Sequence, residues 1–238
     1  MGRLIVLEGT DGAGKSTQLE LIKKHLKSKR LTYDYLHFPM YGHNEFSEVI
    51  AKFLRGEFGG VDDVNPFFVA NIYAMDRFLF LPELSLKLKE NDVVLLDRYV
   101  FSNMAFQAGK FDKEKDPKSW DSIIDWIDKF EFEFLELPYP DLTIFFDVPM
   151  EVVKERLSQE RKGSDRDYLK GKQDIHEADL EFQKRVRDTY LALYTEEDYE
   201  DYHIVPCAEP LMDKSWDVFS PDKLFNSYVH IIDEILNG

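Results

Sequence analysis

The sequence predicts an α/β protein with a five-stranded parallel sheet that is flanked by helices. Short apolar runs alternate with longer segments of helical spacing, an order typical of doubly wound sheets. Two runs, Val93–Leu96 and Leu142–Phe146, are continuously apolar and end in an aspartate, as strands buried on both faces of a parallel sheet do. A third run, Leu4–Leu7, leads into a glycine-rich loop. We expect ligands to bind beyond the carboxyl ends of these strands.

The other elements follow from hydrophobic spacing. Two further strands are expected at Tyr33–Phe38, which Pro39 closes, and at Tyr202–Val205. Helices are expected at Lys15–Lys29, Asn44–Leu54, Pro66–Lys89, Ser119–Phe134, Met150–Gln159, Ile175–Leu193 and Pro221–Leu236. The polar stretch Glu160–Gln173 carries five cationic side chains and is expected to be a mobile loop between two helices. The length of 238 residues predicts one domain, residues 1–238.

Composition argues against several classes of protein. The chain is 44% hydrophobic, but no apolar run approaches the roughly 20 residues that span a bilayer. The first residues lead directly into a strand without a signal-peptide pattern, so we expect a soluble cytoplasmic protein. The net charge of −16 argues against a nucleic-acid-binding surface. The single cysteine, Cys207, excludes an intrachain disulfide and is expected to be a small apolar filler.

The segment after the first strand matches the phosphate-loop pattern G-x-x-x-x-G-K-[ST] at every fixed position. Its glycines let backbone N–H groups surround a phosphate, and the start of the following helix favours an anion. We expect it to bind ATP through Gly9, Thr10, Asp11, Gly12, Ala13, Gly14, Lys15, Ser16 and Thr17. Within it, Lys15 is expected to reach the outer phosphates and Ser16 to ligate Mg²⁺. A plain glycine-rich turn is the alternative, which the flanking strand and helix disfavour.

Two acidic residues near the expected phosphate site need a separate explanation. A carboxylate at Asp11 lies inside an anion-binding loop, so it is expected to face a hydroxyl or a cation, unless it only caps the turn. Asp97 ends a strand, where acids often serve Mg²⁺, and the adjacent Arg98 has the paired donors that bind a phosphate. A structural ion pair at the strand end is the alternative.

Several ordered segments together are similar to one known family. They are 7–17 (LEGTDGAGKST), 38–42 (FPMYG), 73–77 (YAMDR), 97–107 (DRYVFSNMAFQ) and 174–177 (DIHE). In order and spacing the chain resembles the thymidylate kinases within the P-loop nucleoside monophosphate kinases, from Met1 to about Tyr194. The Asp-Arg-Tyr-x-x-Ser-Asn block is the most specific part, and the last forty-odd residues carry little signal.

The resemblance implies a pocket for dTMP and a role for each residue in it. Asp11 would accept a hydrogen bond from the sugar 3′-hydroxyl, and Arg98 would hold the acceptor phosphate. Tyr73 would stack on thymine, Arg77 would donate to its O4, and Asn103 would pair with its N3 edge. The pocket would be completed by Phe38, Pro39, Tyr41, Leu54, Ser102, Phe106 and Gln107, with Phe106 placed where a ribose 2′-hydroxyl would need room. Taken singly, Tyr73 and Phe106 fit core aromatics better than pocket residues, Arg77 fits a surface charge better and Asn103 a helix N-cap; the case for the pocket rests on the ordered set.

The resemblance also implies a lid over the triphosphate at about residues 160–173. Gly12 stands where some relatives have a catalytic arginine, which leaves Arg161 and Arg166 as candidates to neutralise the transferring phosphoryl group. Met40 replaces a cation that relatives often have, so Tyr41 or a lid cation is expected to substitute. His176 replaces a tyrosine and is expected to line the pocket without acid–base work.

Together these features predict the ATP-dependent phosphorylation of dTMP to dTDP, with Mg²⁺ and catalytic Lys15, Asp97 and Arg98. The metal would be held by Ser16 and Asp97. The resemblance implies a homodimer. Two other functions stay open at this point: a kinase for another pyrimidine nucleotide or a deoxynucleoside, and a nucleotide-binding switch without a small acceptor.

Overall fold

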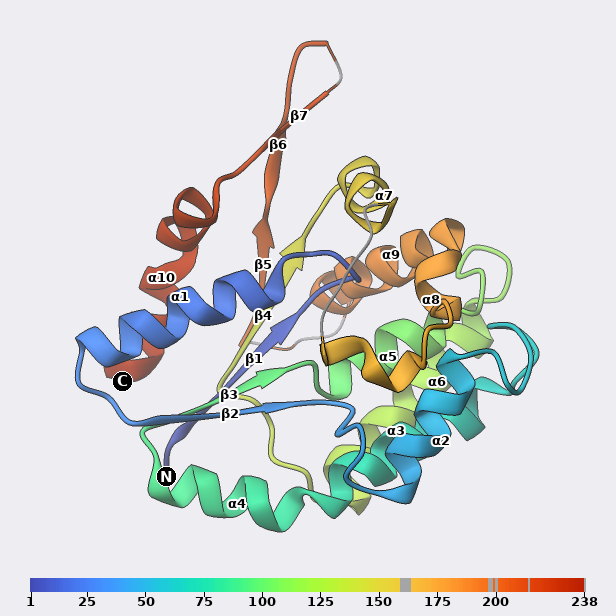
Figure 1. Ribbon diagram of the computed structural model, residues 1–238, viewed down its shortest axis with the longest axis horizontal. Coiled ribbons are helices and arrows are strands. Elements are labelled where there is room, and N and C mark those ends of the chain that lie inside the picture. The colour runs from blue at the N-terminus through green and yellow to red at the C-terminus, as the bar shows by residue number, and fades with distance from the viewer. Residues whose placement is uncertain (159–163, 197–198, 200, 214, 238) are drawn as a thin grey trace.

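The computed structural model, which describes residues 1–158, 164–196, 199, 201–213 and 215–237, is built around the predicted five-stranded parallel sheet (Figure 1). Its strands are β1 (Arg3–Glu8), β2 (Tyr33–His37), β3 (Val93–Asp97), β4 (Leu142–Asp147) and β5 (Tyr202–Pro206). They lie in the order β2-β3-β1-β4-β5. The carboxyl ends of β1, β2 and β3 therefore lie side by side, at the edge where the functional residues were expected.

The central strand β1 is buried on both faces, which explains its unbroken apolar run. Leu4 and Val6 pack in one core cluster, whereas the alternating Ile5 and Leu7 pack in another. This alternation follows from the two-residue repeat of a strand. A continuous apolar strand therefore supports a layer of helices on each side of the sheet.

The helices form two layers and an outer group. The first cluster, with Leu4 and Val6, is covered by α3 (Pro66–Leu79), α4 (Leu81–Glu90), α5 (Val100–Ala108), α6 (Pro117–Asp128) and α9 (Leu180–Glu196). The second, with Ile5 and Leu7, is covered by α1 (Lys15–Ser28), α7 (Met150–Ser158) and α10 (Pro221–Asn237). The remaining helix α2 (Glu45–Leu54) packs on α3, and the short α8 (Ile175–Ala178) contacts α9.

Three helices predicted as single units are divided, so those predictions were wrong in extent. The expected helix 66–89 breaks at Phe80, and Pro82 lies in the first turn of α4, where its missing N–H costs nothing. The expected helix 119–134 continues beyond α6 as a π-helix at Lys129–Phe134. The expected helix 175–193 is interrupted at Asp179, whose backbone is extended.

One helix and one pair of strands were not predicted. Helix α5 was missed because all of its residues are buried, so it has no polar face and no helical periodicity. Strands β6 (Ala208–Pro210) and β7 (Trp216–Val218) pair antiparallel and form an arm that projects from the body (Figure 1). The expected loop 160–173 contains a 3₁₀-helix at Ser164–Leu169. In the part of the chain that the structure describes, no helix is long and apolar enough to cross a membrane.

Candidate active site

A cleft of about 1580 Å³ opens beyond the carboxyl ends of β1, β2 and β3. It brings together most of the residues that the sequence singled out. Those that line it are Asp11, Gly12, Ala13, Gly14, Lys15, Ser16, Thr17, Phe38, Pro39, Tyr41, Leu54, Tyr73, Arg77, Asp97, Arg98, Ser102, Asn103, Phe106 and Gln107. Gly9 and Thr10 are buried at the start of the loop. The segments thus meet in space although they are far apart in sequence.

The phosphate loop has the backbone shape that its glycines allow. Gly14 has φ +92°, a left-handed conformation, and α1 begins at the next residue. At Gly9 a Cβ would lie 2.9 Å from the Cβ of Ala13, so a larger residue would displace the loop. The start of α1 is thereby exposed to the cleft, where its unpaired N–H groups favour an anion.

Lys15, Asp97 and His37 lie together at one end of the cleft. The Lys15 Nζ donates to the Gly9 carbonyl at 3.3 Å and lies 4.0 Å from Asp97 Oδ1, and His37 Nδ1 lies 3.5 Å from Asp97 Oδ2. Burial alone would raise the pKa of Asp97, but Lys15 and His37 bring it down to about 2. Asp97 is therefore ionised at neutral pH.

The same group fits a magnesium ion bound with a nucleotide. Among the described residues, the buried Asp97 Oδ1 has no hydrogen-bond partner, and the Ser16 side chain is exposed to the cleft. Both are oxygen ligands of the kind that Mg²⁺ takes. No three His, Cys, Asp or Glu side chains within the described ranges gather as a metal site. A Mg²⁺ at Ser16 and Asp97 would therefore take its other ligands from phosphate and water.

Arg98 lies between the phosphate loop and the rest of the cleft. Its Nη2 donates to Asp11 Oδ1 at 2.7 Å, its Nη1 donates to the Ser102 hydroxyl at 3.2 Å, and its guanidinium lies 4.9 Å from the ring centre of Phe106. Burial alone would lower the pKa of Arg98, but Asp11 raises it above its usual value. The Asp11 carboxylate, which lies inside an anion-binding loop, thus faces a cation, as expected.

Two residues that the sequence did not single out hold this arrangement in place. Gln183 on α9 donates to the other Asp11 oxygen at 2.9 Å. Glu8, fully buried at the end of β1, accepts from the backbone N–H groups of Tyr99 and Ser102 and from the hydroxyls of Ser102 and Tyr190. A carboxylate directly before the phosphate loop was the available signal for Glu8. For Gln183 the sequence holds no signal.

A buried ion pair fixes the floor of the cleft. Arg77 donates through Nε and Nη2 to the two oxygens of Glu131, each at 2.6 Å. Asn103 Nδ2 donates to Glu131 at 2.8 Å and to the Ala70 carbonyl at 3.0 Å, whereas Asn103 Oδ1 has no partner among the described residues. Asn103 is inside α5, so its interpretation as a helix N-cap was wrong. Glu131 was missed because its partners are distant in sequence.

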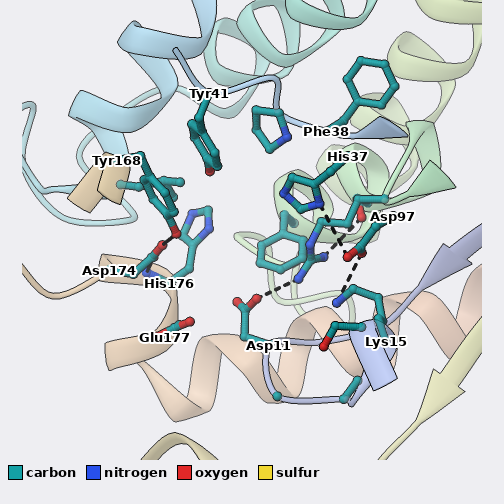
Figure 2. A pocket seen from close by; sticks show the side chains of 18 of the residues that line it. Asp11, Lys15, His37, Phe38, Tyr41, Asp97, Tyr168, Asp174, His176 and Glu177 are labelled. Carbon is teal, nitrogen blue, oxygen red and sulfur yellow. Dashed lines mark hydrogen bonds and ion pairs between the residues drawn. The ribbon is translucent and has the colours of Figure 1, made fainter. Parts of the chain in front are cut away.

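Tyr41, Tyr168, Asp174 and His176 form the wall opposite Lys15, Asp97 and His37, with Asp11 between the two groups (Figure 2). The rings of Tyr41 and Tyr168 are stacked, with centroids 3.9 Å apart and planes 5° apart. The Tyr168 hydroxyl donates to Asp174 Oδ2 at 3.0 Å. Burial and the nearby Asp11 raise the pKa of Asp174 to about 7. Burial and Lys110 lower the pKa of His176 to about 3, so its ring is neutral near pH 7.

A further lobe of the cleft lies next to the phosphate loop and was not predicted. It is lined by Gln18, Cys207, Phe219, Pro221 and Leu224. Cys207 is buried as expected, and burial raises the pKa of its thiol to about 12. Arg156 on α7 donates to the Gly12 carbonyl at 2.9 Å, so a cation contacts the loop at the position where the loop arginine is missing. The last part of the chain carried little sequence signal, which is why this lobe was missed.

Of the two lid arginines, neither side chain is described. Arg161 lies outside the described residues. Arg166 is in the 3₁₀-helix, but its side chain lies outside the described part. Their catalytic roles stay predictions, as do those of the other site residues.

An enzyme that moves a phosphoryl group between two nucleotides needs a triphosphate loop and a second, separate pocket opening on the same space. The cleft has both, on a parallel sheet with a phosphate loop after its first strand. These features place the chain among the P-loop nucleoside monophosphate kinases, which are phosphotransferases.

Comparison with known proteins names the family. Residues 7–214 match the family model "Thymidylate kinase", and the chain belongs to this family. A thymidylate kinase of Mycobacterium tuberculosis is 32% identical over 190 residues, which are 80% of this chain and 85% of that one. A thymidylate kinase of Leuconostoc citreum is 35% identical over 214 residues, covering 88% and 89%. The solved thymidylate kinase of Candida albicans has the same fold, with a TM-score of 0.71 over 98% of this chain and 92% of that one, at 21% identity.

Proposed function

We propose that this protein transfers the γ-phosphoryl group of ATP to the phosphate of dTMP, giving dTDP and ADP. The observation that carries the proposal is the Arg98–Asp11 pair at 2.7 Å. It puts a guanidinium between the phosphate loop and the aromatic pocket, where an acceptor phosphate has to meet a donor triphosphate. Family membership supports the choice of ATP and dTMP as the two substrates.

We propose that ATP occupies the loop side of the cleft. The triphosphate would lie against residues 9–17, with Lys15 at the outer phosphates and the base in the lobe of Cys207, Phe219 and Leu224. Mg²⁺, held by Ser16 and Asp97, would neutralise phosphate charge. Arg156 steadies the loop through the Gly12 carbonyl, and Arg161 and Arg166 are proposed to approach the transferring group.

The acceptor nucleotide is proposed to lie on the other side, against Tyr73. The Asn103 Oδ1, which has no partner among the described residues, is suited to accept from the N3–H of thymine. Arg77 uses Nε and Nη2 for Glu131, and Nη1 remains to donate to O4. Phe38, Pro39 and Leu54 would enclose the base, and Tyr41, Phe106 and Gln107 the sugar and phosphate. Ser102 would act through Arg98, to which it is hydrogen-bonded.

The reaction needs little general-base catalysis, because the attacking oxygen of dTMP is already an anion. The protein contributes position and charge: Lys15 on the leaving side, Arg98 on the attacking side. Burial would lower the pKa of Lys15, and the nearby Arg98 lowers it further while Asp97 raises it, so both lysine and arginine depend on the local acids. Asp11 and Asp97 thereby offset part of the repulsion between Lys15 and Arg98.

The first prediction concerns Arg98. We expect Arg98→Ala to lower dTMP-dependent ADP release by ~10³-fold or more, because charge neutralisation dominates phosphoryl transfer. A coupled ADP-release assay measures this. Arg3→Ala is the control, since Arg3 pairs with Asp141 outside the cleft, and it should keep wild-type turnover. Unchanged turnover in Arg98→Ala would remove Arg98 from the site.

We also propose that the chain is a homodimer, a single domain of residues 1–238 and a cytoplasmic protein. The dimer is supported by the exposed rings of Trp126 and Phe134. They belong to a series of neighbouring aromatic rings made by Phe67, Trp126, Phe130 and Phe134. One domain is supported by the two core clusters, which share one sheet. The free, buried Cys207 suits a reducing compartment. The net charge of −16 makes nucleic acid an unsuitable partner.

A further inference from the structure

Arg55, directly after α2, is a buried cation that no part of the proposed reaction uses. Its side chain is 2% exposed, although arginine is almost never buried without partners. Three of its nitrogens donate: Nε to Glu57 at 2.7 Å, Nη2 to Glu48 at 3.1 Å, and Nη1 to the backbone carbonyl of Tyr168 at 2.6 Å. The two acids are local, but Tyr168 is 113 residues away in the chain.

The contact with Tyr168 joins α2 to the 3₁₀-helix 164–169. Two ion pairs run alongside, Lys170–Glu48 at 3.4 Å and Lys172–Glu57 at 3.6 Å. Both lysine side chains are more than half exposed, and exposed pairs of this kind contribute little to stability. The hydrogen bond from Arg55 is part-buried and charge-assisted, which makes it the stronger connection.

Tyr168 lies beside Tyr41, which is proposed to enclose the sugar and phosphate of the acceptor. Its ring stacks on Tyr41, its hydroxyl donates to Asp174, and it lines the cleft (Figure 2). Tyr41 and Tyr168 also pack against the cluster of Ile50, Phe53, Leu54 and Val69 on α2 and α3. A shift of the Tyr168 backbone would separate the two rings and open this wall.

We propose that Arg55 is a positioning residue for the acceptor nucleotide, acting through Tyr168. By fixing the Tyr168 carbonyl to the end of α2, it holds the tyrosine ring parallel to Tyr41 and so completes the acceptor wall. It does not touch the donor side, where Lys15, Ser16 and Arg156 lie. The inference rests on the proposed function, and it predicts a larger change in the KM for dTMP than in the KM for ATP. Because the same 3₁₀-helix carries Arg166, which is proposed to approach the transferring group, loss of the anchor is also expected to lower kcat.

The kinetic test compares the KM values for dTMP and ATP. We expect Arg55→Gln to raise the KM for dTMP about tenfold and to leave the KM for ATP within about twofold. The KM for dTMP of Arg55→Lys should lie between those of wild type and Arg55→Gln, because one ammonium cannot serve three separate acceptors in the same geometry. Glu57→Gln is the matched control: it removes an ion pair of Arg55 but not the Tyr168 contact, and it should behave as wild type. Equal changes in both KM values, or none, would overturn the proposal.

A double-mutant cycle tests whether Arg55 acts through Tyr168. If it does, Arg55→Gln combined with Tyr168→Leu should raise the KM for dTMP no further than Tyr168→Leu alone. If the increase in the KM for dTMP in the double variant equals the product of the two single increases, the two residues act separately, which would contradict the inference.

A measurement without substrate separates this inference from the proposed function. Amide hydrogen exchange of residues 167–174 should be faster in Arg55→Gln than in wild type and unchanged in Glu57→Gln. An inactive wild type that shows this difference would refute the proposed function and leave the anchoring by Arg55 standing. Equal exchange in all three proteins would refute the anchoring.

Discussion

At Arg98 the backbone and the side chain are both constrained. Its φ of +68° is unusual for a residue with a side chain, and such strain persists only where the surroundings fix it. Here the Arg98 N–H donates to the Leu7 carbonyl and the guanidinium is held by Asp11 and Ser102. Glu8 in turn fixes Ser102. The charge that the proposed reaction needs is thus placed before any substrate binds.

The second prediction concerns Asp174, whose pKa is raised to about 7 by burial and by Asp11. The folded protein keeps a proton that the unfolded chain releases near pH 4, so the free energy of unfolding should fall as the pH rises from about 4 to 7. Asp174→Asn lacks this titration. Relative to the variant, wild type should lose stability between pH 5 and 7 and then level off, as measured by urea denaturation at each pH. A difference that stays constant with pH would contradict the assignment.

At the scale of elements, one carboxylate joins three helices beneath the acceptor pocket. Glu131 on the π-helix accepts from Arg77 on α3 and from Asn103 on α5. The π-helix follows α6 directly. Both residues proposed to recognise thymine are therefore oriented by the same buried anion.

The third prediction is that Glu131→Gln destabilises the fold by ~3–5 kcal/mol, because it leaves Arg77 buried without its counter-charge. It should also weaken the use of dTMP, since Arg77 and Asn103 lose their common partner. Glu133→Gln, on the exposed side of the same π-helix, is the control and should change neither property. Thermal unfolding and the KM for dTMP measure the two effects. A stability equal to that of the control would show that Arg77 is not held by this pair.

The sequence was sufficient for the strands and for one half of the site. All five strands, the phosphate loop and the Asp97–Arg98 corner follow from apolar runs and fixed spacings, which are local properties. Glu131, Gln183 and Arg156 could not be predicted, because their partners are distant in sequence and a lone charged residue on a helix is usually on the surface. The expected helix 66–89 is divided next to Pro82, and the spacing of the apolar residues does not show this break.

At the scale of the whole molecule, an acidic protein places four cations around one cleft. The net charge is −16, yet Lys15, Arg77, Arg98 and Arg156 all line one cleft. The same cleft is also lined by Asp11, Glu48, Asp97, Asp167, Asp174 and Glu177, so a phosphate would be held by local contacts with these cations rather than by a net positive field. On the outside, the exposed rings of Trp126 and Phe134 and the partly buried rings of Phe67 and Phe130 form an aromatic surface, with neighbouring ring centres 5.5–6.2 Å apart.

The fourth prediction concerns this aromatic surface. If a second copy of the chain covers it, wild type should sediment as a dimer, and Phe134→Glu should weaken the dimer by placing a charge where apolar rings meet. Met212→Glu at the tip of the β6–β7 arm is the control, because Met212 is also an exposed apolar side chain but lies on a different element. Sedimentation velocity over a range of concentrations is the measurement. A monomeric wild type, or a dimer broken only by Met212→Glu, would contradict the proposed interface.

The fifth prediction is the most direct test of the proposed function: ATP-dependent ADP release measured with dTMP, dUMP, dCMP and thymidine as acceptors. dTMP should turn over fastest. dUMP should be ~10–200-fold less efficient in kcat/KM, because it lacks only the methyl group. dCMP should be far weaker, because its amino group would face the Arg77 donor, and thymidine should fail because it has no phosphate for Arg98. Equal turnover of dTMP and dCMP, or ADP release that no nucleotide stimulates, would contradict the assignment.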